Sequence, residues 1–330
     1  MKEEEIRPKK IFDEYLSLCA ADTQRYFASA PRFEIGCPAC GAAGEPSFEK
    51  NGFCYALCLD CQTLYVNPRP EAAAFASYYT EAPSVRYWAT TFYQATAEAR
   101  REKIWKHKAG QIYDIVVQYC NGSAEIIDIG GGYGVFAEEM EKLSGDPVTI
   151  IEPGPELAAV CRGRNLSVVE KFLEDVNSCD LPEGRKVFVS FELIEHLHTP
   201  ELFFEQLYIL MAPGDHFVFT TLSGTGLDIR VLWSQSKSVS PPHHLNFFNP
   251  ESVEILLRRI GFEGITVTTP GRLDLDILQK SGEQVQDRFW RTFLQRMNDE
   301  NKIQWQELIA SSGWSSHMMV QCTKPVIPND

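Results

Sequence analysis

A glycine-rich turn with acidic residues on both sides lies near the middle of the chain. Residues 126–134 read IIDIGGGYG, so an apolar run leads into a set of alternating glycines. Such a turn lets backbone N–H groups approach a bound nucleotide closely at the carboxyl edge of a parallel sheet. Glu152 stands 22 positions after Gly130, where nucleotide-binding sheets carry the carboxylate that binds ribose hydroxyls. The pattern predicts a nucleotide-type cofactor site, and the alternative is a tight strand–helix turn in another α/β protein.

The first acid of the turn indicates which kind of cofactor fits. Asp128 precedes Gly130 by two residues, and the spacing D-x-G-x-G-x-G differs from the G-x-G-x-x-G of dinucleotide folds. A carboxylate in this place suits an ammonium group better than a phosphate, because like charges repel. The spacing therefore argues against a pyrophosphate and favours a ligand with an amino group.

Four cysteines form two C-x-x-C pairs in the N-terminal part of the chain. The first pair is Cys37 and Cys40, the second is Cys58 and Cys61, and residues 41–57 separate them. Each pair makes a knuckle that aims two thiolates at one point, and two knuckles supply the tetrahedral shell that Zn²⁺ prefers. A four-thiolate shell leaves no open position for substrate, so we expect structural zinc in a ribbon; the alternative is a redox pair.

Composition limits the cellular setting and the partners. The chain has 330 residues and a formal charge of −14, from 45 acids against 31 lysines and arginines. Such a surface repels phosphate backbones, which disfavours nucleic acid as a partner. No apolar run reaches the length of a membrane span, and the first residues do not form a signal peptide. Paired metal-type cysteines indicate a reducing compartment, so we expect a cytoplasmic protein.

The elements that must position these residues follow an alternating pattern. Short apolar segments separated by helical patterns predict an α/β fold with a parallel sheet covered on both faces. Strands are expected at about 125–129, 147–152, 167–169, 187–191, 217–221, 263–269 and 318–322. Helices are expected at about 134–144, after Pro155, at about 200–211 and at about 250–260.

Four segments are expected along the chain. They are an N-terminal helical segment (1–33), a zinc ribbon (34–70), a helical linker or lid (71–120), and the α/β part (121–330), with a helical insertion at about 271–314.

Together these features resemble the class I S-adenosylmethionine (SAM) methyltransferases, whose first motif reads D-x-G-x-G-x-G. The resemblance covers roughly residues 121–269 and the last strand, and it implies a Rossmann-like sheet of seven strands. It also implies that Gly130, Gly132 and the neighbouring Tyr133 contact the cofactor, that Glu152 holds the ribose, and that Asp128 orients the methionine amino group.

The resemblance extends to the segments after the third and fourth strands. Phe172 is expected to cover the adenine, and the acid that the family usually places in this turn aligns with Lys171 or Glu170. Residues 191–200 resemble the E-x-x-E-H-x-x-x-P segment of ubiquinone-type methyltransferases, which implies that Phe191 and Glu192 line the methionine end of SAM. In some relatives the acids and the histidine of this segment hold a divalent metal.

A long loop follows the fifth strand and carries two adjacent histidines. The segment from His243 to Phe248 resembles sugar C-methyltransferases that also carry an N-terminal four-cysteine zinc module. Those enzymes use a Glu-His pair here, and His243-His244 replaces it in this chain. His244 is therefore the first candidate for the general base, with His243 and Glu192 as further catalytic candidates, and an imidazole titrates in a range that suits this role. The alternative is that His244 only anchors the loop.

The resemblance implies a SAM-dependent methyltransferase that acts on a small polar acceptor, such as a sugar or nucleotide-sugar. One alternative is an RNA methyltransferase that uses the zinc ribbon for docking, against which the acidic balance argues. Another is a SAM-binding regulatory protein without turnover. Nothing in the sequence indicates the oligomeric state.

Overall fold

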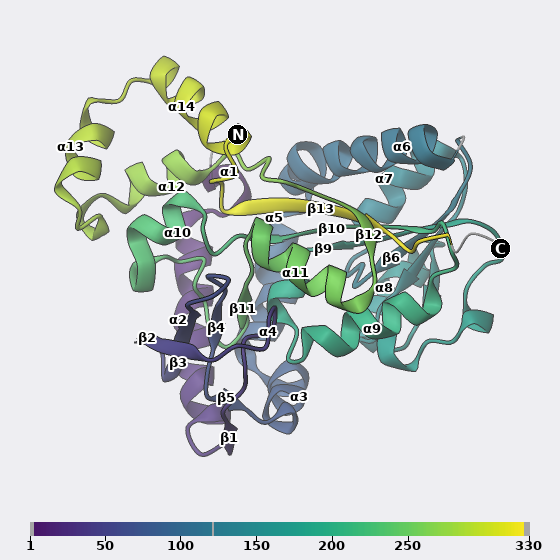
Figure 1. Ribbon diagram of the computed structural model, residues 1–330, viewed down its shortest axis with the longest axis horizontal. Helices are drawn as coiled ribbons and strands as arrows, with labels where there is room; N and C mark the ends of the chain where they lie inside the picture. The colour runs from purple at the N-terminus through teal and green to yellow at the C-terminus, as the bar shows by residue number, and fades with distance from the viewer. Residues whose placement is uncertain (1–2, 121, 327–330) are drawn as a thin grey trace.

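The computed structural model describes residues 3–120 and 122–326 (Figure 1). One long sheet with helices on both faces forms the C-terminal part of the chain, and the N-terminal helices and a smaller sheet pack at one end of it. No helix within the described ranges combines the length and the apolar character that crossing a membrane requires.

The long sheet has seven strands in the order β12-β13-β10-β9-β6-β7-β8. Neighbouring strands from β10 to β8 are parallel, whereas β13 runs antiparallel to both β10 and β12. This order confirms the expected seven-stranded α/β sheet, including the last strand paired beside the sixth. The strands are β6 (Glu125–Ile129), β7 (Val148–Ile151), β8 (Ser167–Val169), β9 (Lys186–Phe191), β10 (His216–Leu222), β12 (Glu263–Thr268) and β13 (His317–Thr323).

Alternate residues of the central strands enter two separate apolar clusters, one on each face. In β6 the side chain of Ile126 joins one cluster and that of Ile127 joins the other. In β9 Val187 and Phe188 divide in the same way, because successive side chains of a strand point to opposite faces. A strand covered on both faces must be apolar throughout, which explains why β9 and β10 read as continuous apolar runs.

Helices cover both faces of the sheet. The cluster that contains Ile126 is completed by α6 (Lys106–Cys120), α7 (Val135–Ser144) and α8 (Pro155–Gly163). The cluster that contains Ile127 is completed by α9 (Pro200–Leu210) and α11 (Pro250–Ile260). Asn249 caps α11, accepting hydrogen bonds from the N–H groups of Glu251 and Ser252, as its place before Pro250 predicts.

The N-terminal part places a small sheet between helices. Its helices are α1 (Glu3–Ile6) and α2 (Lys9–Phe27), and its strands are β1 (Arg32–Phe33), β2 (Gly44–Lys50), β3 (Phe53–Cys58), β4 (Leu64–Val66) and β5 (Arg69–Pro70). β1 and β5 pair with each other in a separate two-stranded sheet. The small sheet consists of β2, β3 and β4, and β11 (Asn246–Phe247), from a distant part of the sequence, joins it as a fourth strand beside β4. The sequence did not indicate this strand, because two residues are too short for an alternating pattern.

A long helical run connects the small sheet to the large one. It comprises α3 (Ala72–Glu81), α4 (Pro83–Tyr87), α5 (Tyr93–Arg100) and α6, with wider π-helical turns at Trp88–Phe92 and Arg101–Trp105.

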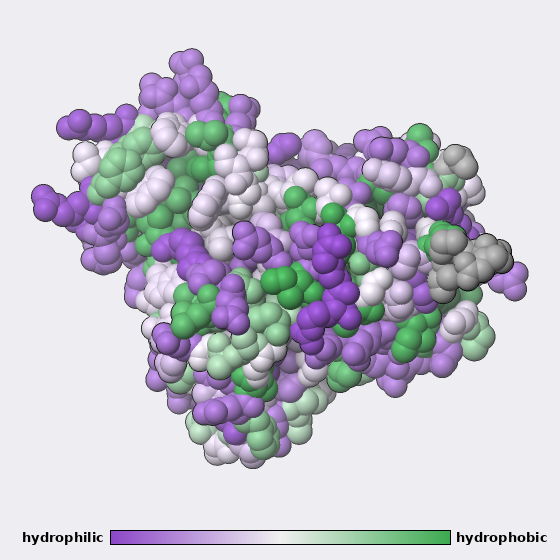
Figure 2. Space-filling model, in the orientation of Figure 1, coloured by the Kyte–Doolittle hydropathy of each residue, from purple (hydrophilic) through white to green (hydrophobic). Residues whose placement is uncertain are grey.

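The insertion between β12 and β13 packs around an apolar cluster that it shares with α10 (Leu227–Leu232). Its helices are α12 (Asp274–Ser281), α13 (Arg288–Arg296) and α14 (Asp299–Ser311). Figure 2 shows hydrophobic side chains at the surface of this region. Phe289, Phe293 and Trp305 line a cavity of about 300 Å³ there.

The glycine that begins α7 offers a test of how tightly the turn packs. Gly134 has a left-handed backbone (φ 70°), and a Cβ there would lie 2.4 Å from Leu166 Cδ1. Gly145, at the other end of α7, has φ 78° and open space around it. We expect Gly145→Ala to cost about 1–2 kcal/mol from the left-handed backbone. Gly134→Ala should cost about 1–3 kcal/mol more from overpacking.

Urea unfolding of the two variants beside the wild type measures both costs. Equal losses in the two variants would contradict the close packing of the turn.

Candidate functional site

The glycine turn between β6 and α7 brings backbone N–H groups and two carboxylates together. Gly130 and Gly132 have φ of 74° and 55°, which residues with side chains rarely adopt. Glu152 follows β7 and is buried, with its carboxylate accepting hydrogen bonds from the N–H of Gly132 (3.1 Å) and of Gly154 (2.9 Å). The turn is therefore tied to the acid that the sequence pairs with it.

Asp128 lies beneath the turn with one oxygen unsatisfied. The side chain is buried, and its Oδ2 has no hydrogen-bond partner among the described residues. Burial raises the pKa of Asp128 to about 7, and the charge of Glu152 adds to this. A buried acceptor without a donor costs free energy, which a cationic ligand group could offset. The residues present therefore fit the predicted ammonium group.

Glu192 stands at the carboxyl end of β9 and is surrounded by donors. Lys108 Nζ lies 3.1 Å from its Oε1, and Thr220 donates a hydrogen bond to the same oxygen at 2.7 Å. His317 Nδ1 is 3.4 Å away. Burial opposes ionisation, but the charges of Lys108 and His317 hold the pKa of Glu192 well below its usual range. The carboxylate is therefore ionised, and φ of 54° marks a strained backbone at Glu192.

Lys108 was not among the residues that the sequence singled out. It lies on the apolar face of α6 and donates a hydrogen bond to Thr220 Oγ1 at 2.7 Å. Its ammonium lies 4.6 Å from the centre of the Phe191 ring. The sequence signal that could have identified Lys108 is a single lysine on the apolar face of an amphipathic helix. A buried lysine needs a buried polar or acidic partner, so its position indicates a polar site.

His317, which begins β13, was also outside the predicted site. Its Nδ1 lies 3.4 Å from Oε1 of Glu192, so this side chain faces the end of β9.

Glu195 links the end of β9 to the histidine loop. Its carboxylate is buried and accepts a hydrogen bond from Thr221 at 2.7 Å, and its backbone carbonyl accepts one from Leu245 N at 2.7 Å. Burial raises the pKa of Glu195 to about 8, and the charge of Glu192 adds to the shift. Ligand atoms of Glu195, His196 and His244 lie within 4.8 Å of one another, so the group also has the composition of a divalent-cation site.

The two loop histidines have different partners. His243 is buried, with Nε2 2.6 Å from the hydroxyl of Tyr78. His244 Nδ1 lies 2.5 Å from the carbonyl of Ser238, and a carbonyl only accepts. Nδ1 of His244 therefore carries the proton, which leaves the lone pair on Nε2. Burial lowers the pKa of His244 to about 4, so this imidazole is neutral at pH 7.

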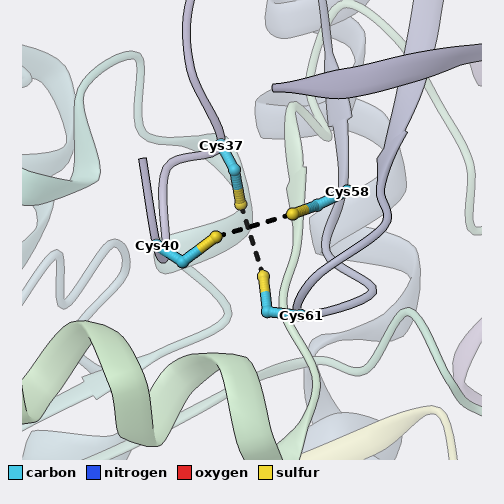
Figure 3. A group of neighbouring side chains, drawn as sticks. All are labelled: Cys37, Cys40, Cys58 and Cys61. Atoms are coloured by element: carbon cyan, nitrogen blue, oxygen red, sulfur yellow. Dashed lines mark hydrogen bonds between the residues drawn. The ribbon is translucent and has the colours of Figure 1, made fainter. Parts of the chain in front are cut away.

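The four cysteines of the two C-x-x-C pairs converge on one point (Figure 3). The Sγ atoms of Cys37 and Cys61 are 3.4 Å apart, and those of Cys40 and Cys58 are 3.5 Å apart. A disulfide would hold sulfurs about 2.05 Å apart. A tetrahedral zinc with bonds of about 2.3 Å would place them about 3.8 Å apart. The arrangement fits a four-thiolate metal shell.

The cysteine module also holds the histidine loop. β11 pairs with β4, and the hydroxyl of Tyr55 donates a hydrogen bond to the carbonyl of His244 at 2.8 Å. Asn249 Nδ2 donates a hydrogen bond to the carbonyl of Cys61 at 2.7 Å. Arg69 Nη2 donates one to Asn246 Oδ1 at 2.7 Å. Segments 177 to 189 residues apart in the sequence therefore form one unit.

The remaining predicted residues lie around the turn. Phe172 follows β8 and is 63% exposed, so its ring is free to meet a ligand. Phe191 packs in the core, with its ring centre 4.7 Å from that of Phe136. Tyr133 stacks on Tyr93 from α5, with ring centres 3.6 Å apart.

Comparison with known proteins agrees with this geometry. A family model described as "Methyltransferase domain" matches residues 97–267, more than half of the chain. The ubiquinone biosynthesis O-methyltransferase of Vibrio vulnificus (strain YJ016) is 29% identical over 118 residues, 33% of this chain and 49% of that protein. The protein of the same name from Xanthomonas euvesicatoria pv. vesicatoria (strain 85-10) is 26% identical over 152 residues, 42% of this chain and 63% of that protein. The matched part thus spans less than two thirds of either relative.

Similar solved structures include a SAM-dependent methyltransferase from Archaeoglobus fulgidus, with a TM-score of 0.46, 17% identity, and coverage of 70% of this chain and 100% of that one. The plantazolicin methyltransferase BpumL in complex with a triazolic desmethylPZN analog and SAH has a TM-score of 0.49 and 15% sequence identity. The match covers 76% of this chain and 95% of that one. With TM-scores below 0.5, these likenesses add no weight to the strand order. On the family match, with which the strand order and the glycine turn agree, the chain belongs to the family of methyltransferase domains.

Proposed function

We propose that this chain transfers a methyl group from SAM to a small polar acceptor. The observation that carries the proposal is the unsatisfied buried oxygen of Asp128 beneath the glycine turn, beside the carboxylate of Glu152. A ligand that combines an ammonium group with ribose hydroxyls meets both acids, and SAM is such a ligand. The family match and the strand order support the same cofactor.

The proposed cofactor contacts follow the turn. The backbone of Gly130 and Gly132 lies against the cofactor, next to the ring of Tyr133. Glu152 already accepts one hydrogen bond on each oxygen, and each oxygen retains a lone pair for a ribose hydroxyl. Asp128 takes the amino group, and Phe172 covers the adenine from its exposed position.

Bound SAM supplies a methyl group on a sulfonium, with a neutral thioether as the leaving group. The chain must align the acceptor with that methyl and remove a proton from the acceptor. His244 is the proposed base, because Nε2 keeps its lone pair while Nδ1–H is held by Ser238. His243 is committed to Tyr78 and is the second candidate. The new bond joins acceptor and methyl carbon, and the released proton goes to His244 Nε2.

Glu192 is proposed to border the methionine end of SAM. Its backbone N–H donates to the carbonyl of Thr220, and its ionised carboxylate is held by Lys108. This fixed negative charge lies on the side where the sulfonium is expected, and Phe191 lies next to it in the strand.

The acceptor is proposed to be a sugar or nucleotide-sugar, on the strength of the four-cysteine module combined with the His243-His244 loop. The names of the curated relatives make O-methylation the first reaction to test. An RNA methyltransferase is the alternative, which the charge of −14 disfavours. A SAM-binding regulator without turnover is the other alternative.

The four cysteines are proposed to hold one structural zinc. Without a metal, the contact with Cys37 and burial raise the pKa of Cys61 to about 12. Zinc would replace the protons and leave no open position for a substrate. Its proposed role is to stiffen the module that holds the histidine loop.

Cofactor binding is tested by calorimetry with S-adenosylhomocysteine (SAH). Gly130→Arg should abolish binding, because φ is 74° and a Cβ would lie 3.0 Å from Leu193 Cδ2, inside the turn. Gly313→Arg is the matched control, with φ of 82° and open space around it. The native protein and this control should bind SAH alike. A native protein that binds no SAH would remove the basis of the proposal.

Metal content tests the cysteine site. The purified protein should contain about one zinc per chain, and Cys37→Ser or Cys58→Ser should lose most of it. Cys179→Ser serves as the control, because this thiol is exposed and lies outside the module. Elemental analysis of all four proteins gives the answer. A zinc content that the Cys37 and Cys58 variants keep would place the metal elsewhere, for instance at Glu195, His196 and His244.

The proposed base is tested by turnover with an acceptor found in a screen of sugars and nucleotide-sugars. His244→Ala should lower turnover about 10²–10⁴-fold, the usual contribution of a general base, while SAH affinity stays unchanged. His107→Ala, at an exposed position of α6, is the control. Wild-type turnover in His244→Ala would show that the residue only anchors the loop.

The pH profile of the wild type adds a second readout. Burial lowers the pKa of His244 to about 4, and the base works in its neutral form. Protonation of this imidazole should therefore reduce turnover only as the pH falls toward that value. A loss of activity with a midpoint near pH 6.5, the ordinary value for histidine, would contradict the buried environment.

A further inference from the structure

Two arginines of the N-terminal helices form no ion pair with any carboxylate of the described residues. Arg7 lies between α1 and α2, and Arg100 ends α5. The Nε atom of each is buried without a hydrogen-bond partner. Neither guanidinium forms an ion pair with a carboxylate of the described residues. Leaving a guanidinium partly buried and unpaired costs free energy, so a fold keeps one where a ligand meets it.

The neighbour of Arg100 in sequence shows the usual arrangement. Arg101 pairs with Glu139 and lies 2.6 Å from Glu138. The chain has a large excess of acids, so an arginine without a carboxylate is not explained by a shortage of partners. The contrast singles out Arg7 and Arg100.

Both arginines are placed by packed helices. α1 packs against α5, close to the start of β13 in Figure 1. The N–H of Glu3 donates a hydrogen bond to Asp276 Oδ2 at 2.8 Å, and Glu5 pairs with Lys103. α1 is thus tied to the insertion and to the helical run that carries Arg100. The arginine that follows α1 is held in place before a ligand arrives.

Ring contacts place Arg7 near the histidine loop. Its guanidinium carbon lies 5.5 Å from the centre of the Phe12 ring, which is 6.1 Å from that of Tyr15. The Tyr15 ring centre is 5.7 Å from that of His243.

Burial and then the charge of Arg7 lower the pKa of Arg100. Arg7 also contributes to lowering the pKa of His244 and of His317, for both of which burial is the main cause. The carboxylate whose charge raises the pKa of Arg100 is that of Glu192. This carboxylate already interacts with Lys108, Thr220 and His317. The carboxylate that acts on Arg100 is therefore already engaged by other groups.

We propose that Arg7 and Arg100 form an anion subsite beside His244, which binds a phosphate or carboxylate group of the methyl acceptor. Guanidinium groups present paired N–H donors that match the oxygens of such groups. The face of the Phe12 ring, 5.5 Å from the guanidinium carbon of Arg7, supports this side chain. The inference rests on the proposed function, since it names the acceptor as an anion.

The carboxylate of SAM is the other source of the same chemistry. Arg100 lies toward the cofactor side, because it follows Tyr93 by about two turns of α5 and the ring of Tyr93 stacks on Tyr133 of the glycine turn. Arg7 lies toward the histidine loop, because it contacts Phe12, which packs against Tyr15 beside His243. Variants of Arg7 therefore separate the two sources better than variants of Arg100.

The test is calorimetry of the full chain with inorganic pyrophosphate, with and without saturating SAH. Pyrophosphate should bind the SAH-loaded wild type, and Arg7→Gln should weaken that binding by about tenfold or more. Arg7→Lys should keep part of the affinity, because the charge remains. SAH affinity of Arg7→Gln should stay within about twofold of the wild type. Arg288→Gln, at an exposed position of α13, is the control for charge alone.

Several outcomes would overturn the subsite. They are no pyrophosphate binding by the SAH-loaded wild type, equal affinity in Arg7→Gln, and an equal loss in Arg288→Gln. A loss of SAH affinity in Arg7→Gln with pyrophosphate binding unchanged would assign the arginine to the carboxylate of SAM instead. Failure of the wild type to bind SAH would contradict the proposed function but not the anion subsite. In that case the pyrophosphate titration without SAH still tests the two arginines.

Discussion

The docking of the histidine loop on the cysteine module is the constraint on which the site depends. Residues 236–249 contain no regular structure other than the two residues of β11, so this part of the loop takes its shape from its neighbours. β11 pairs with β4, and Leu245 N donates a hydrogen bond to the carbonyl of Glu195, so the loop is fixed on both sides. The module is too thin for a core of its own, and its cysteines share the apolar cluster of the large sheet. The cysteine module, the histidine loop and the edge of the large sheet therefore stabilise one another.

The end of β9 shows how a buried polar site is stabilised. Glu192 has a strained backbone and a desolvated carboxylate, both of which cost free energy. Lys108 and Thr220 offset that cost with charge and hydrogen bonds from two other elements. Each partner would be costly to bury alone, so the group is stable only when complete. This explains why residues from α6, β9 and β10 meet at one point although the sequence separates them widely.

Much of the fold could be predicted from local patterns. Apolar runs located all seven strands, and Pro250 with Asn249 marked the start of α11. The cysteine spacing predicted the cluster of sulfurs. What local patterns could not supply was long-range pairing, since β11 is only two residues long and its partner strand lies 180 residues earlier. The sequence analysis missed Lys108 for the same reason, because only the tertiary structure brings Lys108 to its partner Glu192.

The distribution of charge divides the site into two ends. Asp128 and Glu152 lie at the carboxyl ends of β6 and β7, where a cationic ligand group fits. Toward β10 lies the cationic side chain of Lys108, and Arg7 lies against Phe12 near the histidine loop. Net charge acts over long distances and is screened by salt, whereas a partly buried cation is screened much less. An acidic chain can therefore repel a long polyanion at its surface and still hold a small anion inside. The composition of the chain indicates whether its surface repels a polyanion. Whether a small anion binds inside depends on the partners of each buried charge, which the composition does not show.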